Sequence, residues 1–226
     1  MKVQCFTVGM FDVNTYLLTD EETGHSAIID TGEGEQLVEI LKKENPDIQM
    51  ILLTHAHIDH AGALTYLQEI WDVPTYMPRL EKVLFDTLPM QGSMFGMPAL
   101  NRPCGRIDHL VEDGFELMLG NTKLKFLSTP GHTPGQGCWY DEYDIIVGDT
   151  LFAGSIGRTD FPMSDPSVMV KSLRKLMSLP SHMRVHSGHG PMTTLGEELK
   201  TNPFLGYIRE EQGISGSRGF AWAKFT

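Results

Sequence analysis

The sequence predicts a single α/β domain in which two β-sheets face one another and helices cover their outer sides. A strand meander opens each half of the chain, and strand–loop–helix units follow each meander. Both halves also place histidine or aspartate just beyond strand ends. A sheet with helices on one face buries its other face most simply against a second sheet. The length of 226 residues is sufficient for one large core.

The first half predicts a three-stranded meander followed by alternating helices and strands. Apolar alternation and a turn at 21–24 define the meander, and Leu37, Ile40 and Leu41 share one face of the first helix. Pro46 and Pro74 follow the first two helices and end them. The expected strands are 5–11, 14–20, 25–30, 48–55 and 73–77. The expected helices are 35–45, 63–71 and 80–88.

The second half repeats this plan. Strands are expected within 113–121, 122–129, 136–149 and 183–187, and helices within 164–180 and 197–212. Ser164 or Asp165 is the expected N-cap of the first of these helices, with Pro166 in its first turn. Between the halves, Pro89–Ile107 contains three Pro, three Gly and three Met without periodicity. This segment is either a functional loop or lid, or a floppy insertion.

Composition excludes several functional classes. The formal charge of −11 and the lack of a basic stripe argue against a nucleic-acid partner. No apolar run reaches the roughly 20 residues of a membrane span, and the N-terminus does not resemble a signal peptide. Cys5, Cys104 and Cys138 are odd in number and far apart, which is typical of reduced thiols in a cytoplasmic protein.

The stretch THAHIDHAG (54–62) is the strongest functional signal. His55 and His57 leave an apolar strand at alternate positions, so their side chains point the same way. Asp59 and His60 fall where a helix is expected to begin and can turn towards a second point nearby. One short loop could therefore seed a two-metal site. The alternative is that these are polar residues on a solvated loop.

Three further loops combine a strand end, glycine and a potential ligand. They are STPGHTPG with His132, IIVGDTLF with Asp149 and VHSGHGP with His189. Glycine allows the backbone to turn sharply and to approach a metal closely. Imidazole and carboxylate ligands suit zinc, iron or manganese, and the absence of a cysteine ligand disfavours a structural zinc site.

Taken together, HAHIDH, PGHTPG, GDTLF and SGHGP resemble the metal motifs of the metallo-β-lactamase superfamily. GDTLFAGSIGRTDFP and TNPFL are similar to its hydroxyacylglutathione hydrolase (glyoxalase II)-like branch, short bacterial type. The resemblance implies a four-layer αββα sandwich with two mixed sheets, formed by residues 1–205. It also implies that 206–226 is an extension too short for the helical glutathione-binding domain of the long enzymes.

The resemblance further implies two divalent metal ions, expected to be zinc, with iron or manganese as alternatives. Asp149 and a water or hydroxide would bridge them, and Asp30 would support the histidine loop from behind. Metal 1 would be bound by His55, His57 and His132. Metal 2 would be bound by Asp59, His60 and His189.

The expected reaction is hydrolysis of a small acyl-thioester by the metal-bridging hydroxide, oriented by Asp59. Arg158 is expected to bind an anionic part of the substrate, unless it pairs internally with Asp160. Asp160 replaces an aromatic residue of the long enzymes. This difference weakens the case for glutathione as the thiol carrier of the substrate. The alternative function is a persulfide dioxygenase with one iron on His55, His132 and Asp149. A non-catalytic metal-binding domain is a third possibility. The sequence does not choose the acyl group, the carrier, the native metal or the oligomeric state.

Overall fold

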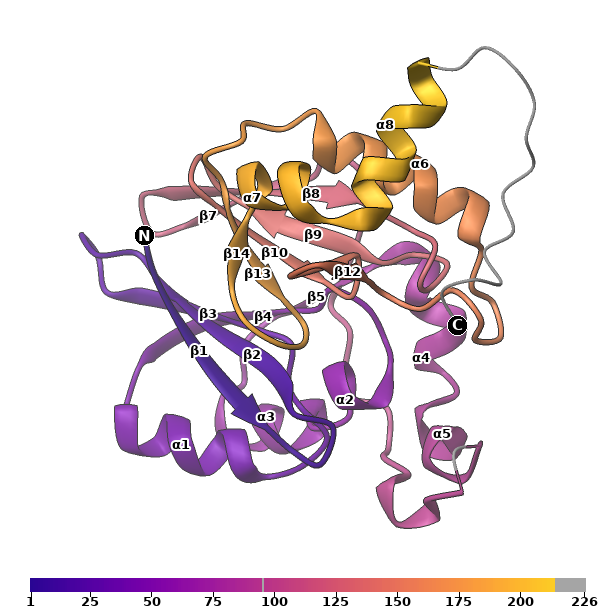
Figure 1. Ribbon diagram of the computed structural model, residues 1–226. Coiled ribbons are helices and arrows are strands. Elements are labelled where there is room, and N and C mark those ends of the chain that lie inside the picture. The colour runs from indigo at the N-terminus through magenta and orange to yellow at the C-terminus, as the bar shows by residue number, and fades with distance from the viewer. Residues whose placement is uncertain (95, 214–226) are drawn as a thin grey trace.

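The computed structural model describes residues 1–94 and 96–213 and shows two six-stranded sheets packed face to face. Helices lie on the outer side of each sheet, which gives four layers (Figure 1). The predicted α/β sandwich is therefore confirmed. Each sheet contains both parallel and antiparallel neighbours, so both are mixed.

The first sheet has the strand order β1-β2-β3-β4-β5-β6. Its first three strands form the expected antiparallel meander, and the remaining neighbours are parallel. Its strands are β1 (Lys2–Val8), β2 (Val13–Thr19), β3 (His25–Ile29), β4 (Asp47–Leu52), β5 (Thr75–Pro78) and β6 (His109–Val111).

The second sheet has the order β14-β13-β10-β9-β8-β7, and a small hairpin, β11-β12, stands apart from it. Only β10 and β13 are parallel neighbours in this sheet. Its strands are β7 (Glu116–Leu119), β8 (Thr122–Ser128), β9 (Gly137–Tyr140), β10 (Asp144–Gly148), β13 (Arg184–Ser187) and β14 (Thr193–Thr194). The hairpin strands are β11 (Leu151–Phe152) and β12 (Ser155–Ile156).

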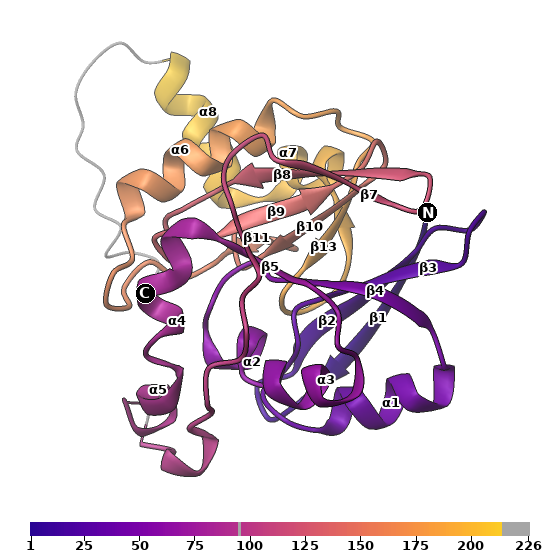
Figure 2. The same ribbon diagram turned by 180° about the vertical axis from the view of Figure 1, so that it is seen from behind.

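The helices form two groups, one on each sheet, as the reverse view also shows (Figure 2). The group of the first half comprises α1 (Gln36–Glu44), α2 (Ile58–Ala61), α3 (Leu64–Ile70), η1 (Arg79–Glu81), α4 (Lys82–Phe85), α5 (Leu88–Met94) and η2 (Pro98–Leu100). The group of the second half comprises α6 (Pro166–Met177), α7 (Leu195–Thr201) and α8 (Pro203–Gly213). Asp165 caps α6 by accepting from the Ser167 and Val168 amides, as one of the two predicted caps.

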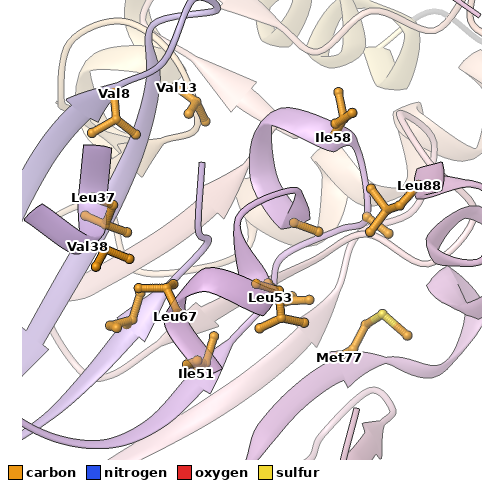
Figure 3. Packing of buried hydrophobic residues seen from close by; sticks show 14 of the residues in the cluster. Val8, Val13, Leu37, Val38, Ile51, Leu53, Ile58, Leu67, Met77 and Leu88 are labelled. Atoms are coloured by element: carbon orange, nitrogen blue, oxygen red, sulfur yellow. The ribbon is translucent and has the colours of Figure 1, made fainter. Parts of the chain in front are cut away.

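Strand residues alternate between two cores, as the pleat requires. In β4, Ile51 packs towards the helices while Met50 and Leu52 pack between the sheets. In β10, Ile146 points between the sheets and Ile145 points to the second helix layer. Figure 3 shows the first outer core, where Leu37 and Val38 of α1 and Leu67 of α3 meet residues of the first sheet.

Two segments differ from expectation. Helix α5 occupies the start of the aperiodic stretch 89–107, and Leu88 and Gln91 anchor it in the interior. The boundary expected after Leu205 falls inside α8, where Leu205 and Ile208 share the second outer core. Of the extension 206–226, residues 214–226 lie outside the described residues. No helix in the described part of the chain is long and apolar enough to cross a membrane.

Candidate metal centre

The seven predicted ligands meet at one edge of the sandwich, because each follows the end of a strand or a turn beside it. His55 and His57 follow β4, and Asp59 and His60 lie in the single turn of α2. His132 lies between β8 and β9, Asp149 directly follows β10, and His189 follows β13. Strand ends of both sheets thus open onto a common point.

The ligand atoms form three overlapping groups, and within each group they all lie within 4.8 Å of one another. His60 belongs to two groups, as does His55, so the groups make one continuous cluster. The groups are His55–His57–His132, His55–His60–Asp149 and Asp59–His60–His189. This is the clustering that the motifs predict.

Asp30 lies behind the histidine loop and orients two of the imidazoles. Its Oδ2 is 2.8 Å from His60 Nδ1 and accepts the Thr54 hydroxyl at 2.7 Å. A carboxylate can only accept, so His60 Nδ1 carries a proton and Nε2 is the nitrogen that faces the cluster. The Thr54 oxygen lies 3.0 Å from His55 Nδ1 and can accept its proton in turn. Both Nε2 atoms are thereby left as potential ligands.

His132 is oriented in the same way by a main-chain oxygen. Its Nδ1 lies 2.8 Å from the carbonyl oxygen of Arg158, which can only accept. Its Nε2 then faces His57 Nδ1 at 2.9 Å. At this distance the two ring nitrogens can share a proton in a hydrogen bond, or both can bind one cation placed beside them.

The residues fit a metal centre. His55 Nε2, His60 Nε2 and Asp149 Oδ1 are buried without a hydrogen-bond partner. Buried polar atoms are otherwise nearly always paired, so this cluster is consistent with a ligand that satisfies them. Gly188 keeps the space open, since a Cβ there would lie 2.2 Å from Asp149 Oδ1 and 2.7 Å from His60 Cε1.

The electrostatics divide the centre into two ends. At the histidine end, burial lowers the pKa of His55 and lowers that of His57 to about 3, which favours neutral imidazoles. At the other end, burial opposes the ionisation of Asp149, yet the neighbouring His60 holds the pKa of that carboxyl below its usual range. Burial also disfavours the charged form of His60, but Asp59 and Asp149 raise its pKa. Neutral imidazole and ionised carboxylate are the forms that bind metals.

A cavity of about 510 Å³ opens above the cluster. Its walls are mostly apolar, and among the described lining residues Arg158 is the one with a permanent positive charge. The guanidinium of Arg158 lies 4.0 Å above the Phe161 ring and pairs with Asp160. The internal ion pair with Asp160 is therefore present, and Arg158 also lines the cavity. The apolar lining comes from Phe11, Ile58, Met97, Phe152, Ile156 and Phe161.

Several residues of the site were not predicted from the sequence. Glu81 and Gln91 are buried and bind the main chain beside His55 and His57. Gln136 accepts from the Asp149 amide and does not belong to a ligand group. Met97 lines the cavity from the 89–107 segment. Nothing in the sequence pattern around Glu81 distinguishes it from a solvent-exposed helix residue. Phe161, by contrast, lies within the GRTDFP motif and could have been predicted to line the cavity.

An αββα sandwich with a histidine–aspartate cluster at the edge shared by its two sheets is the arrangement of the metallo-β-lactamase fold. The family model for the metallo-β-lactamase superfamily matches residues 8–189, and the chain belongs to that superfamily.

Three similar proteins match this chain over nearly their whole length. A hydroxyacylglutathione hydrolase, GloC, from Haemophilus influenzae is 34% identical over 215 residues, 91% of this chain and 98% of that protein. The crystal structure of TTHA1623 in a di-iron-bound form superposes with a TM-score of 0.80 at 38% identity, covering 90% of this chain and 100% of that one. The BLEG-1 B3 metallo-β-lactamase gives a TM-score of 0.82 at 34% identity, covering 90% and 99%.

Proposed function

We propose that this protein is a binuclear metal-dependent hydrolase of small acyl-thioesters, similar in reaction to glyoxalase II. The observation that carries the proposal is the position of the ligand cluster at the base of a mainly apolar cavity. The 34% identity to GloC, named as a hydroxyacylglutathione hydrolase, supports a thioester as the substrate. The charge of −11 fits a small-molecule substrate better than a nucleic acid.

The residues would hold two cations with Asp149 between them. His55, His57 and His132 form the first group, and Asp59, His60 and His189 form the second. Asp149 lies between the groups, with Oδ1 3.4 Å from His60 Nε2 and Oδ2 3.5 Å from His132 Nε2. Two divalent cations would supply Lewis acidity for the substrate carbonyl and a hydroxide nucleophile near neutral pH. Zinc is the metal we propose, and the di-iron form of TTHA1623 makes iron the first alternative.

Asp59 is suited to positioning the nucleophile. Its Oδ2 lies 3.2 Å from His189 Nε2, and the residue also lines the cavity. A carboxylate with one oxygen at a ligand position has a second oxygen with which to accept a proton from water. A thiolate leaves readily, so the reaction needs no separate acid for the leaving group.

The cavity walls favour an apolar acyl group over a highly charged one. A second cavity, with Leu84, Met94 and Met163 among its walls, shares His57 and Phe161 with the first. Methionine side chains adapt to ligands of different shapes. At the mouth, Arg158 is already paired with Asp160, so it offers limited charge to an anionic carrier.

The test combines metal analysis with a thioester panel. The purified protein is analysed for zinc, iron and manganese, then assayed on thioesters that share one acyl group and differ in the thiol: glutathione, coenzyme A and N-acetylcysteamine. We expect two metal ions per chain and thiol release that stops when a chelator removes them. A protein that carries two metals and hydrolyses no member of the panel would contradict the proposal.

Ring opening of a β-lactam is a second candidate reaction, favoured by the likeness to BLEG-1. A chromogenic cephalosporin in the same experiment tests it directly. The dioxygenase alternative predicts a different result, namely one iron per chain and oxygen consumption on a persulfide. That result would replace the hydrolase proposal.

A further inference from the structure

The main chain of Ala56, between His55 and His57, is held on both sides by side chains from another segment: its N–H and its carbonyl oxygen are both hydrogen-bonded. The Ala56 N–H donates to Glu81 Oε2 at 2.8 Å. The Ala56 carbonyl oxygen accepts from Gln91 Nε2 at 2.9 Å. Glu81 ends η1 and Gln91 lies in α5, so both belong to the helical connection between β5 and β6.

The other oxygen of Glu81 binds the second loop of the same ligand group. Glu81 Oε1 accepts the Gly135 N–H at 2.6 Å, three residues beyond His132. The backbones approach closely here, because a Cβ on Gly135 would lie 2.6 Å from the Glu81 nitrogen. One carboxylate therefore joins the loop of His55 and His57 to the loop of His132.

The environment of Glu81 is unusual for a carboxylate. The residue is fully buried, and within the described part of the chain no lysine, arginine or histidine lies at ion-pair distance from it. Burying a charge without a countercharge is costly, and backbone N–H donors offset only part of the cost. An apolar side chain would avoid the cost but would leave two buried N–H groups unpaired.

We propose that Glu81, assisted by Gln91, is a positioning residue that sets the spacing between the two loops of the His55–His57–His132 group. Its hydrogen bonds to Ala56 and Gly135 go to main-chain N–H groups, so it acts through the main chain of the two loops. This inference rests on the proposed metal centre. It assigns a role to the 79–94 segment that is distinct from that of a lid.

The test measures metal affinity in an Asp59→Ala background, which removes the carboxylate of the second group so that binding at the histidine group is observed alone. Glu81→Gln keeps the volume but can accept with only one atom, so one N–H loses its partner. We expect Co²⁺ affinity, measured by competition with a chromophoric chelator, to fall by about ten-fold or more. The visible absorption bands of bound Co²⁺ should also shift, because the nitrogens no longer converge in the same geometry.

Asp144→Asn is the matched control. Asp144 is also a buried carboxylate, but it binds Arg184 and His186 at the start of β10, at the opposite end of the strand from Asp149. Its loss should lower thermal stability and leave Co²⁺ affinity and spectrum unchanged. Gln91→Met removes the bond to the Ala56 carbonyl, together with those to the Leu84 carbonyl and the Thr87 hydroxyl. It should give a smaller loss of affinity and carries the test if Glu81→Gln does not fold.

The outcomes separate this inference from the proposed function. Binding of Co²⁺ by the variants with unchanged affinity and spectrum would overturn the role of Glu81 alone. An equal loss of affinity in Asp144→Asn would also overturn it, since general destabilisation would then be the cause. Failure of the unmutated protein to bind Co²⁺ at all would overturn the metal centre itself.

Discussion

Arg158 donates two hydrogen bonds to Asp160, from Nε at 2.7 Å and from an Nη at 2.8 Å, at the mouth of the cavity. This bidentate pair satisfies the face of the guanidinium that would otherwise bind a carboxylate of the substrate. Asp160 therefore limits the attraction of Arg158 for anionic carriers.

Asp160→Asn should release Arg158 for the substrate. We expect kcat/KM for a glutathione thioester to rise about five-fold or less relative to an uncharged N-acetylcysteamine thioester, since exposed ion pairs are weak. Arg158→Gln should abolish the gain. An unchanged ratio between the two substrates would show that Arg158 does not meet the carrier.

Asp59→Ala should abolish hydrolysis and leave a folded protein. The substitution removes a carboxylate from the Asp59–His60–His189 group but none of the three histidines of the first group. Elemental analysis should show reduced occupancy of the second site, while circular dichroism remains that of the parent. A hydrolysis rate equal to that of the parent would rule out the two-metal mechanism.

Gly188→Ala should prevent metal binding for steric reasons. The added methyl would lie 2.2 Å from Asp149 Oδ1, which must face a cation. Isothermal titration with Zn²⁺ should show the loss of at least one site. Gly206→Ala is the control, because a Cβ there meets nothing within 4 Å and should leave binding unchanged. Normal zinc stoichiometry in Gly188→Ala would show that Asp149 is not a ligand.

Asp144 should make stability depend on pH in the metal-free protein. Burial disfavours its charge, but hydrogen bonds from His186 and Arg184 lower its pKa to about 2. A depressed pKa gives stability that is present above the unfolded value of about 3.9 and is lost as pH falls towards 2. The difference in urea stability between the parent and Asp144→Asn should therefore be largest near neutrality and shrink between about pH 4 and pH 2. A difference that stays constant over this range would contradict the assignment.

The residues of the cluster could be predicted from the sequence because each stands in a short motif at or just beyond a strand end. The spacing of His55, His57 and His132 from their strands determines where their side chains point. The imidazole nitrogens make them suitable metal ligands. The two facing sheets followed from repeated strand–loop–helix units, and alternation in β4 and β10 agrees with burial on both faces.

The supporting residues could not be predicted, because their partners are distant in the sequence. Glu81 bonds to positions 25 and 54 residues away, and no local pattern marks its burial. Helix α5 forms in a stretch without periodicity because Gln91 gains tertiary bonds to the Ala56 and Leu84 carbonyls. The boundary expected after Leu205 ignored Ile208, which completes the same core one helical turn later.

The ligand cluster draws on both sheets, with His55 and His60 attached to the first and His132, Asp149 and His189 to the second. A cation bound there would act as a cross-link between distant parts of one chain. Its binding free energy would then add to the free energy of unfolding, by about 2.7 kcal/mol at a hundred times its dissociation constant. Loss of metal in such a protein would also lower its stability. The contact between the two sheets at the edge that holds the cluster would be weakened first.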